Sequence, residues 1–90
     1  MNYGSEFTPL FLKLLAKLDE QIRERVLKAV EEVLKDPRSG SRLVFSQQVC
    51  FKWRVGDYRM IYKIDERRKT VNFIVVDHRG RIYKRYQSNL

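Results

Sequence analysis

The clearest pattern in the chain is an alternation of apolar and polar residues over residues 51–55 and again over residues 58–64. A period of two residues is typical of a strand with one buried face, so the pattern predicts two strands. Gly56 and Asp57 lie between them and predict a two-residue turn, which fixes the register of the strand pair. The expected cross-strand pairs are Val55 with Tyr58, Arg54 with Arg59, Trp53 with Met60, and Lys52 with Ile61.

This register sorts the side chains of the predicted hairpin onto two faces. The apolar face holds Phe51, Trp53, Val55, Tyr58, Met60 and Tyr62. The other set, which we call the basic face, consists of Lys52, Arg54, Arg59 and Lys63. Like charges directly opposite each other are unfavourable in a sheet, so the Arg54–Arg59 pair indicates a surface that binds an anion. The alternative is an ordinary solvated face, but such faces usually mix both signs of charge, and the nearest acidic residue after the turn is Asp65.

Two segments with helical periodicity precede the hairpin. Thr8 and Pro9 predict the start of the first helix, because Thr is a good N-cap and Pro suits the first turn. Asp19 predicts the start of the second helix, and Pro37 ends it. Two adjoining amphipathic helices predict a helical hairpin that packs through its apolar stripes.

The third predicted strand runs over residues 70–76, which are rich in β-branched residues. Residues 82–86 could add a fourth short strand or form an irregular tail. Residues 2–7 could form a short edge strand, or residues 4–7 could be a cloning remnant. The expected fold is an α+β two-layer domain over residues 1–90. In it, the helical hairpin packs on an antiparallel sheet of three to four strands and leaves the basic face open.

The charge of the chain points to a polyanionic partner. Nineteen Lys and Arg residues outweigh eleven Asp and Glu residues, giving a net charge of +8. Nucleic acid, an acidic protein or a membrane surface would suit this charge. No apolar run approaches a membrane span and no signal peptide is visible, so a cytoplasmic location is expected. The single Cys fits a reducing compartment, and with only one His we expect no metal site and no cofactor.

A second candidate group follows the third strand. His78, Arg79, Arg81 and Tyr83 come directly after it and could reach the basic face. Alternatively, this is a basic loop whose His only caps the end of the strand. Tyr83 and Tyr86 could stack on unpaired bases, as aromatic residues do in proteins that grip single-stranded RNA.

Two blocks of this sequence resemble the RelE/ParE superfamily of prokaryotic toxins, and the RelE branch within it. The blocks are FKWRVGDYRMIY over residues 51–62 and HRGRIY over residues 78–83. The resemblance implies a toxin that cleaves messenger RNA in the ribosomal A site, together with a cognate antitoxin that wraps around it. ParE-like members share the fold but inhibit DNA gyrase, and other members have no demonstrated activity. A gyrase inhibitor, or a non-catalytic domain that binds antitoxin or RNA, is therefore the alternative.

The resemblance also implies roles for individual residues. Lys52 and Arg54 match the two basic positions before the turn, although the well-studied bacterial pattern has Lys where this chain has Arg54. Arg59 matches the phosphate-binding arginine. The segment between Arg79 and Tyr83 is shorter than in that pattern, and no long final helix follows. The expected catalytic set is Lys52, Arg54, Arg59, His78, Arg79 and Tyr83, and the expected further RNA contacts are Lys63, Arg81, Lys84 and Arg85.

The expected chemistry is attack of a 2′-hydroxyl on the adjacent phosphate, without a metal. This reaction needs a base, cations that stabilise the charge on phosphorus, and an acid for the leaving oxygen. Lys52 is one candidate base, because the neighbouring guanidinium groups favour its neutral form, and His78 is the other. Arg54 and Arg59 suit the phosphorane, Arg79 suits the leaving group, and Tyr83 could orient the base or the nucleotide. We expect an acidic antitoxin to cover part of the helical hairpin and to form a hetero-oligomer with the toxin.

Overall fold

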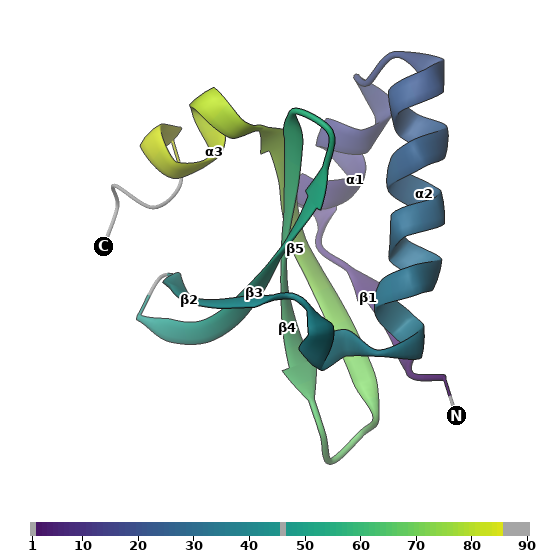
Figure 1. Cartoon of the computed structure of the whole chain (residues 1–90), viewed down its shortest axis with the longest axis vertical. Coiled ribbons are helices and arrows are strands. Elements are labelled where there is room, and N and C mark those ends of the chain that lie inside the picture. Colours follow the sequence, from purple (N-terminus) through teal and green to yellow (C-terminus); the bar gives the residue numbers. More distant parts are fainter. Residues whose placement is uncertain (1, 46, 86–90) are drawn as a thin grey trace.

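The computed structural model describes residues 2–45 and 47–85. Helices α1 and α2 cover one side of a sheet, and helix α3 lies on the opposite side (Figure 1). The elements in chain order are β1 (Gly4–Phe7), α1 (Pro9–Ala16), α2 (Glu20–Lys35), the 3₁₀ turn η1 (Pro37–Ser39), β2 (Ser41–Phe45), β3 (Gln48–Val55), β4 (Tyr58–Asp65), β5 (Thr70–His78) and α3 (Arg79–Arg85).

The sheet has five strands in the order β1-β5-β4-β3-β2. The predicted α+β arrangement of a helical hairpin on a sheet is confirmed, but the sheet is larger than the expected three to four strands. The additional strands are β2 and β1, and β1 runs parallel to β5 whereas the other pairs are antiparallel. Residues 4–7 thus form an edge strand.

The expectation of a fourth strand or an irregular tail at residues 82–86 is wrong over residues 82–85, which are helical. The chain turns out of β5 because the Arg79 amide donates to the Asp57 carbonyl at the β3–β4 turn, at 2.8 Å. Ile82 is then fully buried against the sheet, which fixes α3 there. The remaining residue of the predicted segment, Tyr86, lies outside the described residues.

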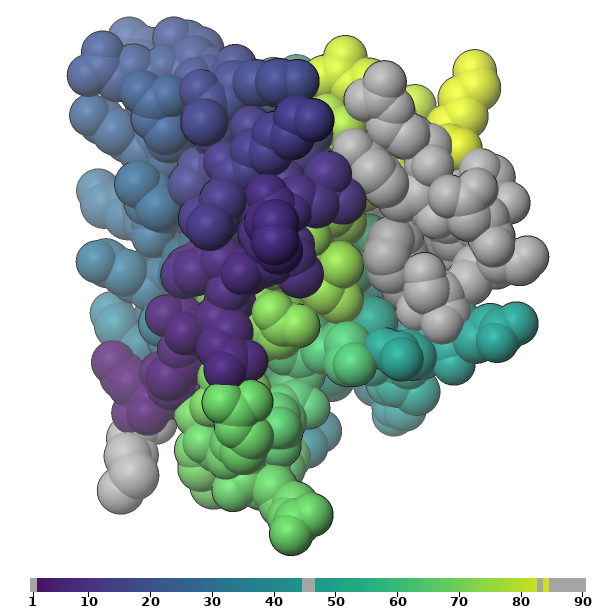
Figure 2. Space-filling view, turned by 180° about the vertical axis from the view of Figure 1, so that it is seen from behind, coloured from purple at the N-terminus to yellow at the C-terminus, as the bar shows by residue number. Residues whose placement is uncertain are grey.

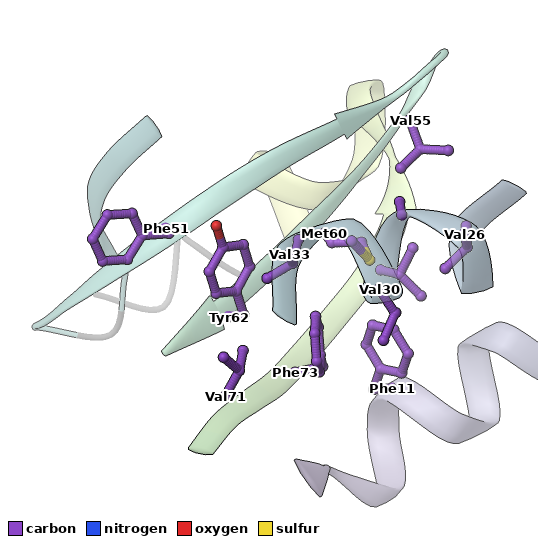
Figure 3. Packing of buried hydrophobic residues seen from close by; sticks show 12 residues of the cluster. Phe11, Val26, Val30, Val33, Phe51, Val55, Met60, Tyr62, Val71 and Phe73 are labelled. Carbon is purple, nitrogen blue, oxygen red and sulfur yellow. The ribbon is translucent and has the colours of Figure 1, made fainter. Parts of the chain in front are cut away.

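The predicted register of β3 and β4 is confirmed for all four pairs. Gly56 has φ 59°, a value that suits the first position of a tight hairpin turn. The apolar face of this hairpin forms the centre of the main core, where Phe51, Val55, Met60 and Tyr62 are buried (Figure 3). Trp53 and Tyr58 are partly buried against the same cluster. The helices contribute Phe11, Val26, Ala29, Val30 and Val33 to the same cluster.

Strand β5 contains a bulge at Ile74. Ile61 pairs with Val75 and Tyr62 pairs with Phe73, so Ile74 has no residue opposite it on β4. Thr8 holds the bulge: its hydroxyl donates to the Ile74 carbonyl at 2.6 Å and accepts from the Phe11 amide at 3.0 Å. Thr8 therefore caps α1, as predicted, and also stabilises the bulge in β5.

The hydroxyl of Tyr62 fastens the loop between α2 and β2 to the sheet. It is fully buried and donates to the Pro37 carbonyl at 2.7 Å. Burial raises the pKa of Tyr62 to about 12. Gly40 packs so closely here that a Cβ would lie 2.3 Å from the Tyr62 oxygen and 2.9 Å from the Lys52 carbonyl oxygen. The start of β2 is thereby held against β3.

We predict that Tyr62→Phe lowers the free energy of unfolding by about 1–3 kcal/mol, because the buried Pro37 carbonyl loses its donor. Tyr58→Phe is the matched control, since the Tyr58 hydroxyl forms no hydrogen bond within the described residues. Urea unfolding of both variants measures the difference. Equal unfolding midpoints for the two variants would show that this hydrogen bond does not hold the loop.

Candidate functional site

The second face of the sheet carries cations beside a small apolar cluster. Lys52 and Arg54 of β3 and Arg59 of β4 share this face, with Arg54 and Arg59 directly opposite each other. Under α3, Cys50, Ile61, Val75 and Ile82 form a second buried cluster. The face is thus partly covered by α3 and not left fully open as expected. Helix α3 and the β2–β3 hairpin lie on the same side of the molecule, away from α2, in both whole-molecule views (Figures 1 and 2).

Asp77 is the carboxylate that the structure places among these cations. It is the cross-strand partner of Arg59 and is only 5% exposed. Its Oδ1 accepts from the His78 amide at 2.7 Å and from Nε of Arg81 at 3.0 Å. The basic face thus receives a carboxylate from β5, which the sequence of the β3–β4 hairpin does not contain. The bulge at Ile74 brings it there, because it reverses the alternation of β5 and turns Asp77 toward Arg59.

The guanidinium of Arg59 is held by the hairpin turn beside it. Its Nη1 donates to the carbonyl oxygens of Gly56 at 2.9 Å and Tyr58 at 2.8 Å. These bonds fix the side chain opposite Arg54, and no carboxylate of the described residues forms a direct ion pair with it. A rigid guanidinium in such a position suits bidentate binding of a phosphate.

Cations at the other end of the sheet have acidic partners within the described residues, unlike Arg54 and Arg59. Arg38 and Lys69 pair with Glu66, and Arg68 pairs with Glu6. The hydrogen bonds from Tyr3 and Arg38 lower the pKa of Glu66, so its carboxylate stays charged. Among residues 2–45 and 47–85, neither Arg54 nor Arg59 forms an ion pair with a carboxylate. Arg54 and Arg59 therefore offer positive charge near the β3–β4 turn, with Asp77 as the neighbouring carboxylate.

His78 lies on the other face of the sheet. It pairs across the strands with Tyr58, and the two rings meet edge to face with centroids 5.6 Å apart. Its Nδ1 accepts from the Gly80 amide at 3.1 Å, so the one acceptor nitrogen of a neutral imidazole is already used. The expectation that His78 reaches the basic face is therefore wrong. The bulge at Ile74 is the cause, because it turns Asp77 toward the basic face and His78 away from it.

The remaining candidates are distributed along α3 and β4. Arg79 is exposed at the start of α3, and Arg81 is tied to Asp77 although its side chain is 57% exposed. Lys84 is exposed on α3. Lys63 faces the same side as Cys50 but lies toward the end of β4, in a small hollow with Glu6 and Asn72. The side chains of Tyr83 and Arg85 lie outside the described part of the structure.

Other kinds of site find little support in the described residues. Burial raises the pKa of the Cys50 thiol, which is unfavourable for a nucleophile, and nearby Lys63 offsets this in part. Over residues 2–45 and 47–85, no three His, Cys, Asp or Glu side chains gather as metal ligands would. Within the same residues, no helix combines the length and apolar character needed to cross a membrane.

We predict that Asp77→Asn lowers the free energy of unfolding by about 1–2 kcal/mol, since the buried partner of the Arg81 guanidinium loses its charge. The effect stays modest because Arg81 is more than half exposed. Asp57→Asn, at an exposed turn residue, should change stability by less than about 0.5 kcal/mol. Thermal unfolding of the two variants compares them, and an unchanged melting temperature for Asp77→Asn would count against this role.

Comparison with known proteins gives relatives that match almost end to end. Toxin RelG of Mycobacterium tuberculosis is 36% identical over 87 residues, covering 94% of this chain and 100% of the relative. The mRNA interferase toxin RelE of Escherichia coli is 31% identical over 83 residues, covering 90% and 87%. A solved structure, the toxin–antitoxin complex RelBE2 from M. tuberculosis, matches with a TM-score of 0.78 and 32% identity over 87% of this chain and 99% of that chain.

The match to a known family includes both faces of the sheet. The family described as the ParE toxin of the type II toxin–antitoxin system parDE matches residues 6–83. This range contains both N-terminal helices, strands β2 to β5, the basic face and the first part of α3. The named relatives are the toxins RelG and RelE, in agreement with the resemblance seen in the sequence. The chain therefore belongs to the ParE toxin family of type II toxin–antitoxin systems.

Proposed function

We propose that this toxin cleaves messenger RNA on the ribosome, using side chains alone to drive attack of a 2′-hydroxyl on the neighbouring phosphate. The observation that carries the proposal is the basic face, where Lys52, Arg54 and Arg59 come together on adjacent strands. The name of the E. coli relative, mRNA interferase toxin RelE, supports the same reaction class. Because ribosomes are cytoplasmic, the proposed function implies that the toxin acts in the cytoplasm.

The basic face has the composition that an RNA phosphate needs. Arg54 and Arg59 offer two planar guanidinium forks from opposite strands, and Lys52 adds a compact ammonium group beside them. Charge that develops on the phosphorus oxygens in the transition state would be stabilised by these fixed donors. Arg59 is pre-oriented by its bonds to the turn, so little reorganisation is needed when the phosphate arrives.

Lys52 is the base in this proposal. It lies half-buried on β3, whereas His78 faces the helical layer and its acceptor nitrogen is engaged. Arg54 and Arg59 stay protonated and cannot serve as bases. The neutral Lys52 amine takes the proton of the 2′-hydroxyl, and the 2′-oxygen forms its bond to phosphorus.

The leaving group departs on the side of α3. As the 2′-oxygen attacks, the bond from phosphorus to the 5′-oxygen breaks, giving a 2′,3′-cyclic phosphate and a 5′-hydroxyl. Arg79 would stabilise or protonate the leaving oxygen, and Tyr83 would orient the base or the nucleotide. Arg81, Lys63, Lys84 and Arg85 would contact the RNA backbone, where Lys and Arg fix the register of the bound strand.

We predict that Arg59→Ala and Arg79→Ala each reduce cleavage of ribosome-bound message by at least about 100-fold, as expected for the loss of a transition-state donor. Lys35→Ala is the control, since it removes an exposed cation from the end of α2. Growth inhibition and message cleavage are measured with and without ribosomes, beside a gyrase supercoiling assay. Full toxicity in both arginine variants would disprove this site, and gyrase inhibition without cleavage would identify a ParE-like action.

We also propose that the toxin binds a cognate acidic antitoxin over its helical hairpin. The net charge of +8 suits an acidic partner, and the M. tuberculosis neighbour was solved as a toxin–antitoxin complex. The outer surface of the hairpin exposes apolar side chains, with Leu12 51% and Leu27 45% exposed. A shallow hollow of about 530 Å³ runs along α2 beside Leu27 and is lined by charges of both signs, from Glu24, Arg25, Lys28 and Glu31. An amphipathic segment with an apolar stripe and complementary charges would fit it.

We predict that Leu12→Asp and Leu27→Asp together weaken binding of the antitoxin by at least about tenfold, because apolar contacts are lost and like charge is added. Val44→Asp is the matched control, since Val44 is 55% exposed on β2, across the sheet from α2. Calorimetric titration with the product of the neighbouring open reading frame measures the affinities. Equal losses in the control would show that the antitoxin does not rely on the hairpin.

A further inference from the structure

A hollow opens at the edge of the sheet next to the basic face. Strand β2 begins to pair at Ser41 opposite Lys52, so the next residues of β3, Trp53 and Arg54, have no partner on β2. The chain before Ser41 turns away into η1 and leaves a space of about 280 Å³. The hollow is lined by Ser39, Gly40, Ser41, Lys52, Trp53 and Arg54.

The lining of this hollow combines an aromatic wall with cations and hydroxyl groups. Trp53 is half-buried: it packs against the main core and also lines the hollow. Its neighbours Lys52 and Arg54 point to the opposite, basic face of β3, so the hollow lies around the edge of this strand from the place where the scissile phosphate would bind. Ser39 and Ser41 add hydroxyl groups, which can donate or accept a hydrogen bond.

The walls of the hollow are held in place by the packing beneath them. The Tyr62 hydroxyl binds the Pro37 carbonyl at 2.7 Å, and the Ser39 hydroxyl donates to the Asp36 carbonyl at 2.8 Å. The Gly40 backbone packs against Lys52 and Tyr62 so closely that no side chain fits between them. The hollow is thus a built feature of the fold, and its volume far exceeds the roughly 30 Å³ that one water occupies in the liquid.

We propose that this hollow binds the base of a nucleotide next to the scissile phosphate, with the base stacked on Trp53. Stacking on an aromatic ring is tolerant of sequence and suits single-stranded RNA. Lys52 and Arg54 hold the adjoining phosphate, and the serine hydroxyls face the edge of the base or its ribose. The inference rests on the proposed function for the identity of the strand, but binding at Trp53 is measurable without cleavage.

The single Trp of the chain gives a direct measurement. The full chain is titrated with a trinucleotide whose riboses carry 2′-O-methyl groups, so that cleavage is blocked, and Trp53 fluorescence is followed. We expect saturable quenching by the trinucleotide and weaker quenching by a nucleoside monophosphate. Inorganic phosphate and ribose 5-phosphate, which lack a base, should leave the fluorescence unchanged.

A substitution that fills the hollow can be compared with the same substitution at a distant site. Ser41→Phe should weaken trinucleotide binding by about tenfold or more, whereas Ser5→Phe, on the opposite edge strand, should not. If Ser41→Phe does not fold, Trp53→Phe and Trp53→Leu are compared by the fluorescence anisotropy of a labelled trinucleotide, and Trp53→Phe is expected to bind it more tightly.

Quenching without message cleavage would uphold this inference and reject the proposed function. Normal cleavage with no quenching, or equal binding by all variants, would overturn the inference alone.

Discussion

The single-residue bulge at Ile74 decides what each face of the central strands can do. Before it, Phe73 points into the main core; beyond it, Val76 does so, and Asp77 turns to the basic face. The bulge is stabilised by the Thr8 hydroxyl, which donates a hydrogen bond to the Ile74 carbonyl and also caps α1. The end of β1, the start of α1 and the composition of the candidate site therefore depend on one local constraint.

Residues that share a short-range pattern could be placed from the sequence. The alternation around the Gly56 turn gave the correct register of β3 and β4, and it gave the core side chains Phe51, Met60 and Tyr62. The N-cap at Thr8 and the helical hairpin also followed from local signals. In each case a few adjacent residues determine the outcome, because turn geometry and periodicity act within one or two elements.

Positions that depend on long-range contacts could not be placed in this way. The bulge is stabilised by a hydrogen bond between residues 8 and 74. It turns His78 away from the basic face and Asp77 toward it, which no signal in the adjacent residues indicated. Helix α3 forms where Arg79 meets the Asp57 carbonyl and Ile82 meets the underside of the sheet. The parallel pairing of β1 likewise depends on a strand more than sixty residues away. The sequence placed the basic residues of β3 and β4 on one face, whereas it did not place the residues of β5 and α3 around them.

The interleaving of core and basic-face residues along β3 and β4 has an evolutionary consequence. Because adjacent residues point in opposite directions, a substitution on the basic face leaves the volume and the contacts of the main core almost unchanged. Substitutions can therefore change the chemistry of the basic face while purifying selection preserves the core face. Proteins with this fold could acquire a new cellular target, or lose activity, through a series of sequences that all still fold.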